Sequence, residues 1–537
     1  MVPIISATVT GRRRVFPSST SRPTNGIPFT KALSIVDGSV IRYSPARAAW
    51  FFDAPNVSDS EALVESLSKT LALYPQWSGS LHMPEPNVAT NSAPHTRRYN
   101  RPQLTWGLDD DPGVEFIEAQ SPHHLSSLLP TPEERAKSHR VWDASVVAAL
   151  GTMSDTPELA LHDRVSSKGL PCMVVQATRF ACGGIAIAVK FAHPLADAQT
   201  LLTFVHDWAA VHRGLTVSVR EFAPEMFDQT AEGDIDAPLP DPSILARSHR
   251  LPLHRYDWWA SATHDCPPFM LPATVIPPDF TNENAGALDL GTPLPWKTWD
   301  ILAPVQYYVI HFTREEILNM WQAATSDAAT AKSGDSQVKV SKLDALLAHI
   351  WTLIVRARGL SLDHDEVHLD VTLGLRTRVS PPLPPSFLGS PLLNIPISQP
   401  GSQISMASAG IIRSSMARYN PEAIGTLLHE MAYMSDPSRR WNAFLGERHT
   451  IVTSWLESRP GMTVHDVDFG FGSKPRMVDS LLFECDGCVQ ILESGVSTSK
   501  TSEWTPWYEA GVSVGMHFKE DVMRRMLEDP CLRKYDN

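Results

Sequence analysis

Residues 183–200 read GGIAIAVKFAHPLADAQT, and this stretch decides the fold. Large apolar side chains occupy every second position along it, which predicts a strand buried on one face: Ile185, Ile187, Val189 and Phe191. Pro194 ends that strand because proline cannot donate to the ladder of hydrogen bonds. Apolar residues then recur at helical spacing over 198–212, which predicts a helix. A strand followed directly by a helix indicates an α/β fold.

The turn between these two elements carries a histidine and an aspartate four residues apart, His193 and Asp197. A neutral imidazole can accept a proton near neutral pH, since its ordinary pKa is about 6.5. An aspartate directly before a helix is also a common N-cap. The pattern HxxxD arises by chance in many proteins. From this stretch alone the pair is therefore either an ordinary loop-and-cap pair or the centre of an active site.

Strands and helices mix through the rest of the chain without a repeated βαβ rhythm. The patterns predict helices over 63–74, 314–324 and 341–359, and strands over 305–312 and 366–379. Residues 214–304 are rich in proline and tryptophan and show little helical pattern. We therefore expect two α/β lobes of similar size, residues 1–213 and 305–537, joined by a long crossover over 214–304.

Composition excludes several classes of protein. A formal net charge of −13 over 537 residues argues against a general nucleic-acid binder. No run approaches 18 apolar residues, so no membrane span is expected. The basic run in MVPIISATVTGRRRVF follows the apolar residues, the reverse of a secretory signal. We expect a cytoplasmic protein.

The six cysteines do not form a disulfide framework. Two of them flank Asp486-Gly487 in LLFECDGCVQILE, which predicts a β-hairpin with Cys485 and Cys488 as the first cross-strand pair. The same spacing could be half of a zinc site, but the sequence has no second half-site. No metal site is expected.

Five more segments change the interpretation of the histidine. FTKALSIVD (29–37), LVESLSKTLALYPQWSGSL (63–81) and SKLDALLAHIWTLIVRARG (341–359) resemble, with FAHPLADAQT, motifs of the BAHD acyltransferases. LGLRTRVSPPLPPSFLGSPLLN (373–394) and TSWLESRPGMTVHDVDFGFGSKPRM (453–477) resemble two more. The motifs occur in the family's order, so the resemblance runs nearly end to end.

The resemblance implies two chloramphenicol-acetyltransferase-like lobes with the active site in a channel between them. It also implies transfer of an acyl group from coenzyme A to an alcohol or amine. Phe471 stands where the family usually has tryptophan, Ser473 and Lys474 precede Pro475, and the 80–170 and 214–300 regions are long. These departures fit fungal members such as the trichothecene acetyltransferases best.

Roles for individual residues follow from the same resemblance. His193 would be the general base, and Asp197 would support it by pairing with Arg376 or, alternatively, Arg378. Thr453 and Trp455 would offer an O–H and an N–H to the developing oxyanion.

The resemblance also implies residues that stabilise the loop over 468–472 and residues that bind the acyl-CoA donor. Asp468, Gly470 and Gly472 would be structural. The coenzyme A candidates are Ser341, Lys342, Arg376 and Ser454. Ser341 and Lys342 open a predicted helix, where free backbone N–H groups can bind phosphate.

We therefore predict an acyl-CoA-dependent O-acyltransferase, most simply an acetyltransferase, acting on a hydroxyl of a small secondary metabolite. Acyl-CoA would be a co-substrate, with no permanently bound cofactor, and the protein a monomer. The alternative is a non-catalytic protein on the same fold that binds coenzyme A or a metabolite. A peptide-bond condensation domain usually has a histidine directly before this motif and a glycine directly after it. Here those positions hold Ala192 and Ala198, which argues against a condensation domain. No serine nucleophile elbow supports an esterase.

Overall fold

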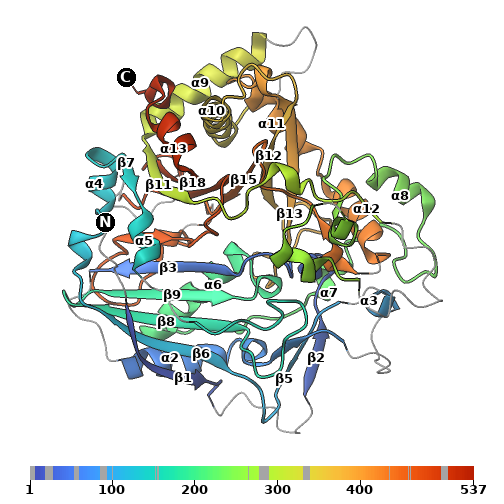
Figure 1. Cartoon of the computed structure of the whole chain (residues 1–537). Coiled ribbons are helices and arrows are strands. Elements are labelled where there is room, and N and C mark those ends of the chain that lie inside the picture. The colour runs from blue at the N-terminus through green and yellow to red at the C-terminus, as the bar shows by residue number, and fades with distance from the viewer. Residues whose placement is uncertain are drawn as a thin grey trace.

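Two mixed β-sheets, each with helices packed against it, lie one above the other in the computed structural model (Figure 1). The structure describes residues 7–18, 28–53, 60–84, 94–98, 101–150, 153, 156–263, 265–276, 290–330, 339–434, 436–457, 459, 461–496 and 506–536. The α/β class and the two-lobed architecture predicted from the sequence are confirmed.

The first sheet carries the HxxxD strand. Its six strands, in spatial order, are β1 (Thr8–Val15), β6 (Val114–Ser121), β8 (Met173–Phe180), β9 (Ile185–Phe191), β3 (Ala46–Phe52) and β16 (Met477–Asp479). Helices α2 (Ser60–Leu71) and α6 (Ala198–His212) pack against each other beside this sheet. The helix predicted over 198–212 is thus confirmed residue for residue.

Strand β9 differs from its prediction in one respect. The alternation predicted one buried face, but all seven of its residues are buried. Ile187 belongs to the core on the α6 side, whereas Ala186 and Ala188 pack with Tyr307 and Val309 of the other lobe. Small alanines allow the second lobe to approach, so the face without large side chains is an inter-lobe face rather than a solvent face.

The second sheet is larger. Its seven strands, in spatial order, are β13 (Leu392–Pro400), β12 (Glu366–Gly374), β15 (His449–Ser454), β17 (Cys488–Glu493), β18 (Val512–Lys519), β11 (Val305–Phe312) and β7 (Val141–Asp143). Helices α9 (Arg314–Thr330), α10 (Lys342–Ala357), α11 (Ser408–Ala417) and α13 (Glu520–Leu527) belong to the same lobe.

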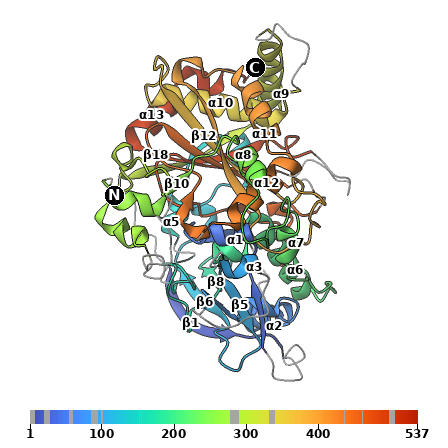
Figure 2. The same ribbon diagram turned by 90° about the vertical axis from the view of Figure 1, so that its right-hand side faces the viewer.

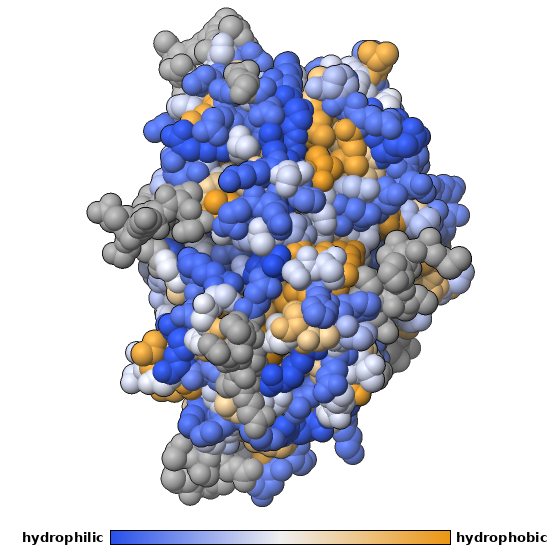
Figure 3. Space-filling model, turned by 90° about the vertical axis from the view of Figure 1, so that its left-hand side faces the viewer, coloured by the Kyte–Doolittle hydropathy of each residue, from blue (hydrophilic) through white to orange (hydrophobic). Residues whose placement is uncertain are grey.

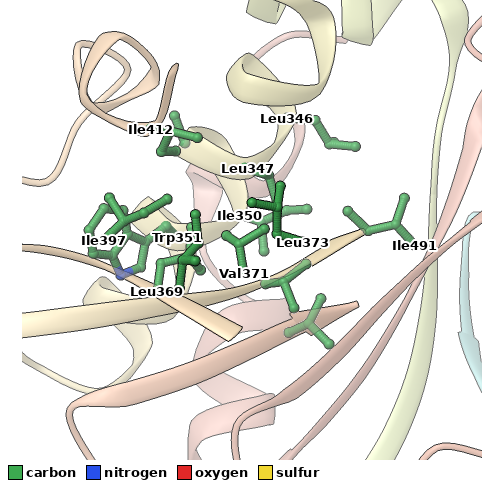
Figure 4. Packing of buried hydrophobic residues seen from close by; sticks show 14 of the residues in the cluster. Leu346, Leu347, Ile350, Trp351, Leu369, Val371, Leu373, Ile397, Ile412 and Ile491 are labelled. Carbon is green, nitrogen blue, oxygen red and sulfur yellow. The ribbon is translucent and has the colours of Figure 1, made fainter. Parts of the chain in front are cut away.

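The core of this lobe lies between α10 and the sheet. Figure 4 shows Leu347, Ile350 and Trp351 of α10 facing Leu369 and Val371 of β12. All are nearly inaccessible to water, and burying each such side chain contributes roughly 1.5–3 kcal/mol. Because the odd-numbered residues of β12 face this core, its even-numbered residues face the other way.

Each sheet borrows a strand from the other half of the chain. β7 pairs with β11, and β16 pairs with β3. The segment that connects α6 to β11 contains α7 (Glu225–Asp228), α8 (Pro242–Ser248) and β10 (Tyr256–Asp257). Its tryptophans Trp258 and Trp296 form a cluster with Phe444. Figure 2 shows α8 beside α12 (Pro421–Ala432), which it contacts.

Smaller elements complete the described chain. A three-stranded sheet joins β2 (Phe29–Ala32), β5 (Gln103–Trp106) and β4 (Ser80–His82), and β10 pairs with β14 (Arg440–Trp441). The short helices are α1 (Ile35–Ser39), α3 (Pro94–Arg98), α4 (Pro132–Lys137) and α5 (Ser145–Ala149).

Several local predictions need correction. The predicted hairpin around Asp486-Gly487 is wrong: the turn forms, but residues 481–485 are not a strand. β17 instead pairs with β15 and β18, because neighbours distant in sequence satisfy its backbone. The strand predicted over 366–379 ends at Gly374, and α9 continues to Thr330. The polar sequence AATAKSGDSQ (328–337) predicts a loop, but its first three residues belong to α9, and residues 331–337 lie outside the described residues.

No helix among the described residues is long and apolar enough to cross a membrane. The face drawn in Figure 3 is mainly hydrophilic, with separate small hydrophobic patches.

Candidate active site

His193 begins a 3-10 turn, His193–Leu195, directly after β9. Its Nδ1 lies 3.0 Å from Ser390 Oγ, a hydroxyl 197 residues away in the sequence. The edge of the ring meets Tyr43, with the two ring centroids 5.3 Å apart. Two contacts from different segments therefore hold the imidazole in place. With the proton on Nδ1, the ring presents a free lone pair on Nε2.

Burial sets the protonation state of this ring. Loss of water around His193 lowers its pKa to about 4, although its own backbone carbonyl and Asp197 act in the opposite direction. Burial has this effect because it disfavours the charged form. The imidazole is therefore neutral at physiological pH and able to accept a proton.

Asp197 turns away from that role and pairs with Arg376. The guanidinium donates from Nη1 to Asp197 Oδ2 at 2.5 Å and from Nη2 to Oδ1 at 2.9 Å. Asp197 Oδ1 also accepts the Thr200 N–H at 2.9 Å and so caps α6. Burial would raise the pKa of this carboxyl, but Arg376 and the Thr200 donors hold it below its usual value. Arg378, the alternative partner, donates instead to backbone carbonyls of Met416 and Tyr419.

A second carboxylate fastens the loop that holds His193. Ser390 N–H donates to Asp37 Oδ1 at 2.6 Å, and the Ser34 N–H donates to Asp37 Oδ2 at 3.1 Å. Gly389 adopts φ +143°, and a Cβ there would lie 3.0 Å from Asp37 Oδ1, so the close approach requires glycine. Burial raises the pKa of Asp37 to about 7 against these donors.

The sequence did not single out Ser390, Asp37 or Tyr43, although the first two lie in quoted segments. The Ser34–Asp37 spacing forms a capping box at α1, a signal that the sequence contains. No local sequence signal connects these residues with His193, because Ser390 lies 197 residues from His193 and 353 residues from Asp37.

Thr453 and Trp455 lie at the end of β15. The backbone N–H of Trp455 donates to Ile491 O at 2.9 Å. Its side chain is 9% exposed and packs in the core that also contains Leu388, two residues before Ser390. Ser454, between them, is exposed. No hydrogen bond of the Trp455 indole N–H is found among the residues that the structure describes.

Asp468 and its glycines form a tether for α6. Asp468 pairs with Arg213, the residue that caps the end of α6, at 2.7 Å. It also accepts the Gly470 N–H at 2.7 Å. Gly470 and Gly472 have φ of +78° and +85°, the left-handed region that favours glycine. Phe471 is 1% exposed and stacks on Phe469. The loop is built for packing.

The donor candidates are divided. Ser341 caps α10 in a capping box with Asp344. Lys342 Nζ lies 4.5 Å from the Trp321 ring centroid and 4.3 Å from that of Tyr508, so a cation does stand at this helix start. Arg376 must be withdrawn from the donor set. It is 5% exposed, and its guanidinium is engaged with Asp197, Thr200 and backbone carbonyls.

A row of polar side chains leads from His193 along the second sheet. Thr372 Oγ1 donates to Asn394 Oδ1, and Asn394 Nδ2 donates to the hydroxyl of Tyr43, both at 2.9 Å. Tyr43 also contacts Trp441, with ring centroids 4.9 Å apart. The neighbours of His193 and Tyr43 therefore include polar side chains of the second sheet and Trp441 of β14, the strand that pairs with β10.

The chain is similar in sequence and in fold to known proteins. The profile of the family described as "Transferase family" matches residues 5–236 and 310–499. Acyltransferase AFT15-1 of Alternaria alternata is 24% identical over 88% of this chain and 87% of its own. Acyltransferase abl6 of Leptosphaeria maculans is 26% identical over 94% of both chains.

Among solved structures, TRI101 of F. sporotrichioides, complexed with coenzyme A and T-2, superposes with a TM-score of 0.57. It is 16% identical, with 94% of this chain and 98% of that chain covered. A likeness at this identity shows that the two chains share a fold.

Proposed function

This chain belongs to the BAHD family of acyl-CoA-dependent acyltransferases, and from that premise we propose that it transfers an acetyl group to a hydroxyl of a small secondary metabolite. One observation carries the proposal: a half-buried imidazole, His193, held through Nδ1 by Ser390 at the end of β9 and kept neutral because burial lowers its pKa. Such a group can act as a general base that removes the proton from the acceptor hydroxyl.

In the proposed reaction, His193 Nε2 takes the proton of the acceptor hydroxyl as its oxygen attacks the thioester carbonyl of acetyl-CoA. The tetrahedral intermediate then collapses, the C–S bond breaks, and the imidazolium returns the proton to the departing thiolate. Ester and free coenzyme A are the products, and no acyl-enzyme is formed. Holding both substrates together supplies much of the rate.

The oxyanion of that intermediate needs hydrogen-bond donors. We assign them to the Trp455 indole N–H and the Thr453 hydroxyl. Support comes from the position of both residues at the end of β15 and from the core that Trp455 shares with Leu388, the residue before the Gly389–Ser390 loop. Asp197 and Arg376 then act as positioning residues, because their pair fixes the turn that carries His193.

For the donor, we assign Lys342 and the start of α10 at Ser341 to the phosphates of coenzyme A, with Ser454 beside the pantetheine arm. The charge of Lys342 and the free N–H groups of a helix start suit phosphate. Acetyl as the acyl group rests on the resemblance of the sequence to the fungal trichothecene acetyltransferases. The proposal retains a monomeric, cytoplasmic enzyme with no resident cofactor.

The test measures release of free thiol from acetyl-CoA with a panel of hydroxylated terpenoids, polyketides and alkaloids, followed by mass detection of the acetyl ester. Wild type should release thiol only with an acceptor, and His193→Ala should lose at least about 100-fold in kcat, the low end of general-base contributions. His139→Ala, an exposed histidine, is the matched control and should equal wild type.

The alternative, a protein that binds coenzyme A without turnover, predicts a different result. Calorimetry would then show acetyl-CoA binding by wild type, with no acceptor-dependent thiol release anywhere in the panel. Equal release by wild type and His193→Ala would remove the histidine from its role.

A further inference from the structure

A second cluster of ionisable side chains lies apart from the HxxxD turn. Its members come from three segments: His254 from the crossover, Asp370 from β12 and His449 from the first position of β15. Asp370 Oδ1 lies 3.0 Å from His254 Nε2, and Asp370 Oδ2 lies 3.2 Å from His449 Nδ1. One ligand atom from each residue falls within 4.8 Å of the other two.

These side chains are withdrawn from water and held by neighbouring rings. The exposed fractions of the three side chains are 13% for His254, 0% for Asp370 and 6% for His449. Tyr256 stacks on His254, with ring centroids 5.2 Å apart and planes at 16°. Phe444 meets His449 edge-on at 5.4 Å. The imidazoles are thus fixed in orientation before any ligand arrives.

Two imidazole nitrogens and one carboxylate oxygen suit a particular kind of ion. Zinc binds histidine at about 2.0–2.1 Å and carboxylate at about 2.0–2.2 Å in tetrahedral geometry, which places neighbouring ligand atoms roughly 3.3–3.5 Å apart. The separations of 3.0 and 3.2 Å lie close to that range, although each involves a different oxygen of Asp370. Because the three ligand atoms lie within 4.8 Å of one another, the side chains would move closer together around an ion. Calcium and magnesium prefer all-oxygen shells, which this cluster does not offer.

We propose that His254, Asp370 and His449 bind one zinc ion, or a divalent transition metal of similar preference. The ion would replace the hydrogen bonds to the Asp370 carboxylate with metal–ligand bonds. It would cross-link the crossover to strands β12 and β15. Three protein ligands leave the fourth position to water or to a group of the acceptor.

The position of the cluster gives the ion a consequence for the neighbouring site. Asp370 lies on the non-core face of β12, two residues from Thr372. Thr372 leads through Asn394 to Tyr43, which touches His193. A zinc ion here would fix the crossover wall beside the acceptor. The metal and the proposed acyl transfer are separate claims, since the site could be loaded in an inactive protein.

The alternative is a cluster that binds no metal, in which both imidazoles donate hydrogen bonds to the buried Asp370 carboxylate. Metal content separates the two. The full chain, freed of any histidine tag, is dialysed against metal-free buffer and assayed by plasma mass spectrometry, then stripped with a chelator and titrated with zinc against a chromophoric competitor. We expect about one zinc per chain.

Variants locate the ion. His254→Gln and His449→Gln should each weaken zinc binding at least about 100-fold, because even loss of an outer-shell partner costs 10–100-fold. His364→Gln is the matched control: His364 is exposed near the start of β12 and should leave affinity unchanged. Circular dichroism checks that each variant folds.

Two outcomes would overturn the proposal. One is wild type that neither retains nor rebinds a stoichiometric zinc ion. The other is equal zinc affinity in folded His254→Gln, His449→Gln and wild type, which would place the ion elsewhere among the 20 histidines. If the variants do not fold, cobalt-loaded wild type decides, since intense visible bands of a tetrahedral N/O site support the assignment and an octahedral spectrum contradicts it.

Discussion

Replacing Asp197 with asparagine should destabilise the protein and slow the enzyme without removing a group from the chemistry. Asparagine keeps an oxygen to accept the Thr200 N–H, but its amide NH₂ then faces the guanidinium of Arg376. Asp197 and Arg376 are 6% and 5% exposed, so the arginine charge is left buried without a counter-charge. Breaking a buried pair in this way costs roughly 3–5 kcal/mol. Because asparagine still caps α6, Asp197→Asn should avoid the further loss of about 1 kcal/mol in stability that Asp197→Ala would cause by removing the cap.

A double-mutant cycle isolates the pair. In Asp197→Asn/Arg376→Gln, two neutral amides replace two charges, so the free energy of unfolding should fall by less than the sum of the single losses. A coupling energy of about 1–3 kcal/mol is expected for residues in contact. Arg378→Gln is the matched control. Among the residues that the structure describes, Arg378 donates to backbone carbonyls of Met416 and Tyr419 and not to Asp197, so Arg378→Gln should combine additively with Asp197→Asn.

Urea unfolding supplies the free energies, and acceptor-dependent thiol release supplies kcat and KM. Asp197→Asn should lower kcat and should move the acid limb of the pH profile to lower pH, since the base is still His193 and the Asp197 carboxylate raises its pKa. The reasoning fails if Asp197→Asn unfolds at the wild-type urea concentration yet loses as much activity as His193→Ala. It fails equally if the cycle is additive.

Three further outcomes follow from the site and its supports. The wild-type kcat/KM should decline only as the pH falls through about 4, because burial lowers the pKa of His193 to that value and the protonated ring cannot accept a proton; a limb near 6.5 would show an unburied imidazole. Ser390→Ala should lower kcat up to about tenfold, the worth of one hydrogen bond of 0.5–1.5 kcal/mol, whereas Ser398→Ala on β13, which holds a histidine remote from the turn, should not. Phe471→Ala should cost roughly 3–5 kcal/mol of unfolding free energy because its ring is 1% exposed, and calorimetry showing no change would remove the packing role of the loop.

Local patterns predicted the elements next to the site well. The α6 helix and its Asp197 cap depend on side chains within four residues, as does the capping box of Ser341 and Asp344 at α10. Such features follow from the backbone groups left unpaired at a helix start. The hairpin around Asp486 was wrong for the opposite reason: which strand pairs with β17 is decided by distant segments.

The site itself could be predicted only in part. His193 and Asp197 are neighbours in sequence, but Arg376 lies 179 residues from its partner, and only the resemblance to a family suggested the pair. Ser390 and Asp37 were missed because a serine after a glycine and an aspartate in a capping box have common structural explanations. The His254–Asp370–His449 cluster escaped for the same reason, since its ligands show no regular spacing.

Both halves of the chain are needed to set the properties of the histidine. β9 of the first half delivers His193, whereas Ser390 and Arg376, which hold its ring and its turn, come from the second half. The exchanged strands β7 and β16 tie those halves together, and the alanines of β9 admit Tyr307 and Val309 of the other lobe against it. The burial that keeps the imidazole neutral therefore exists only once the lobes have docked, so the docking of the lobes and the readiness of the base are one event.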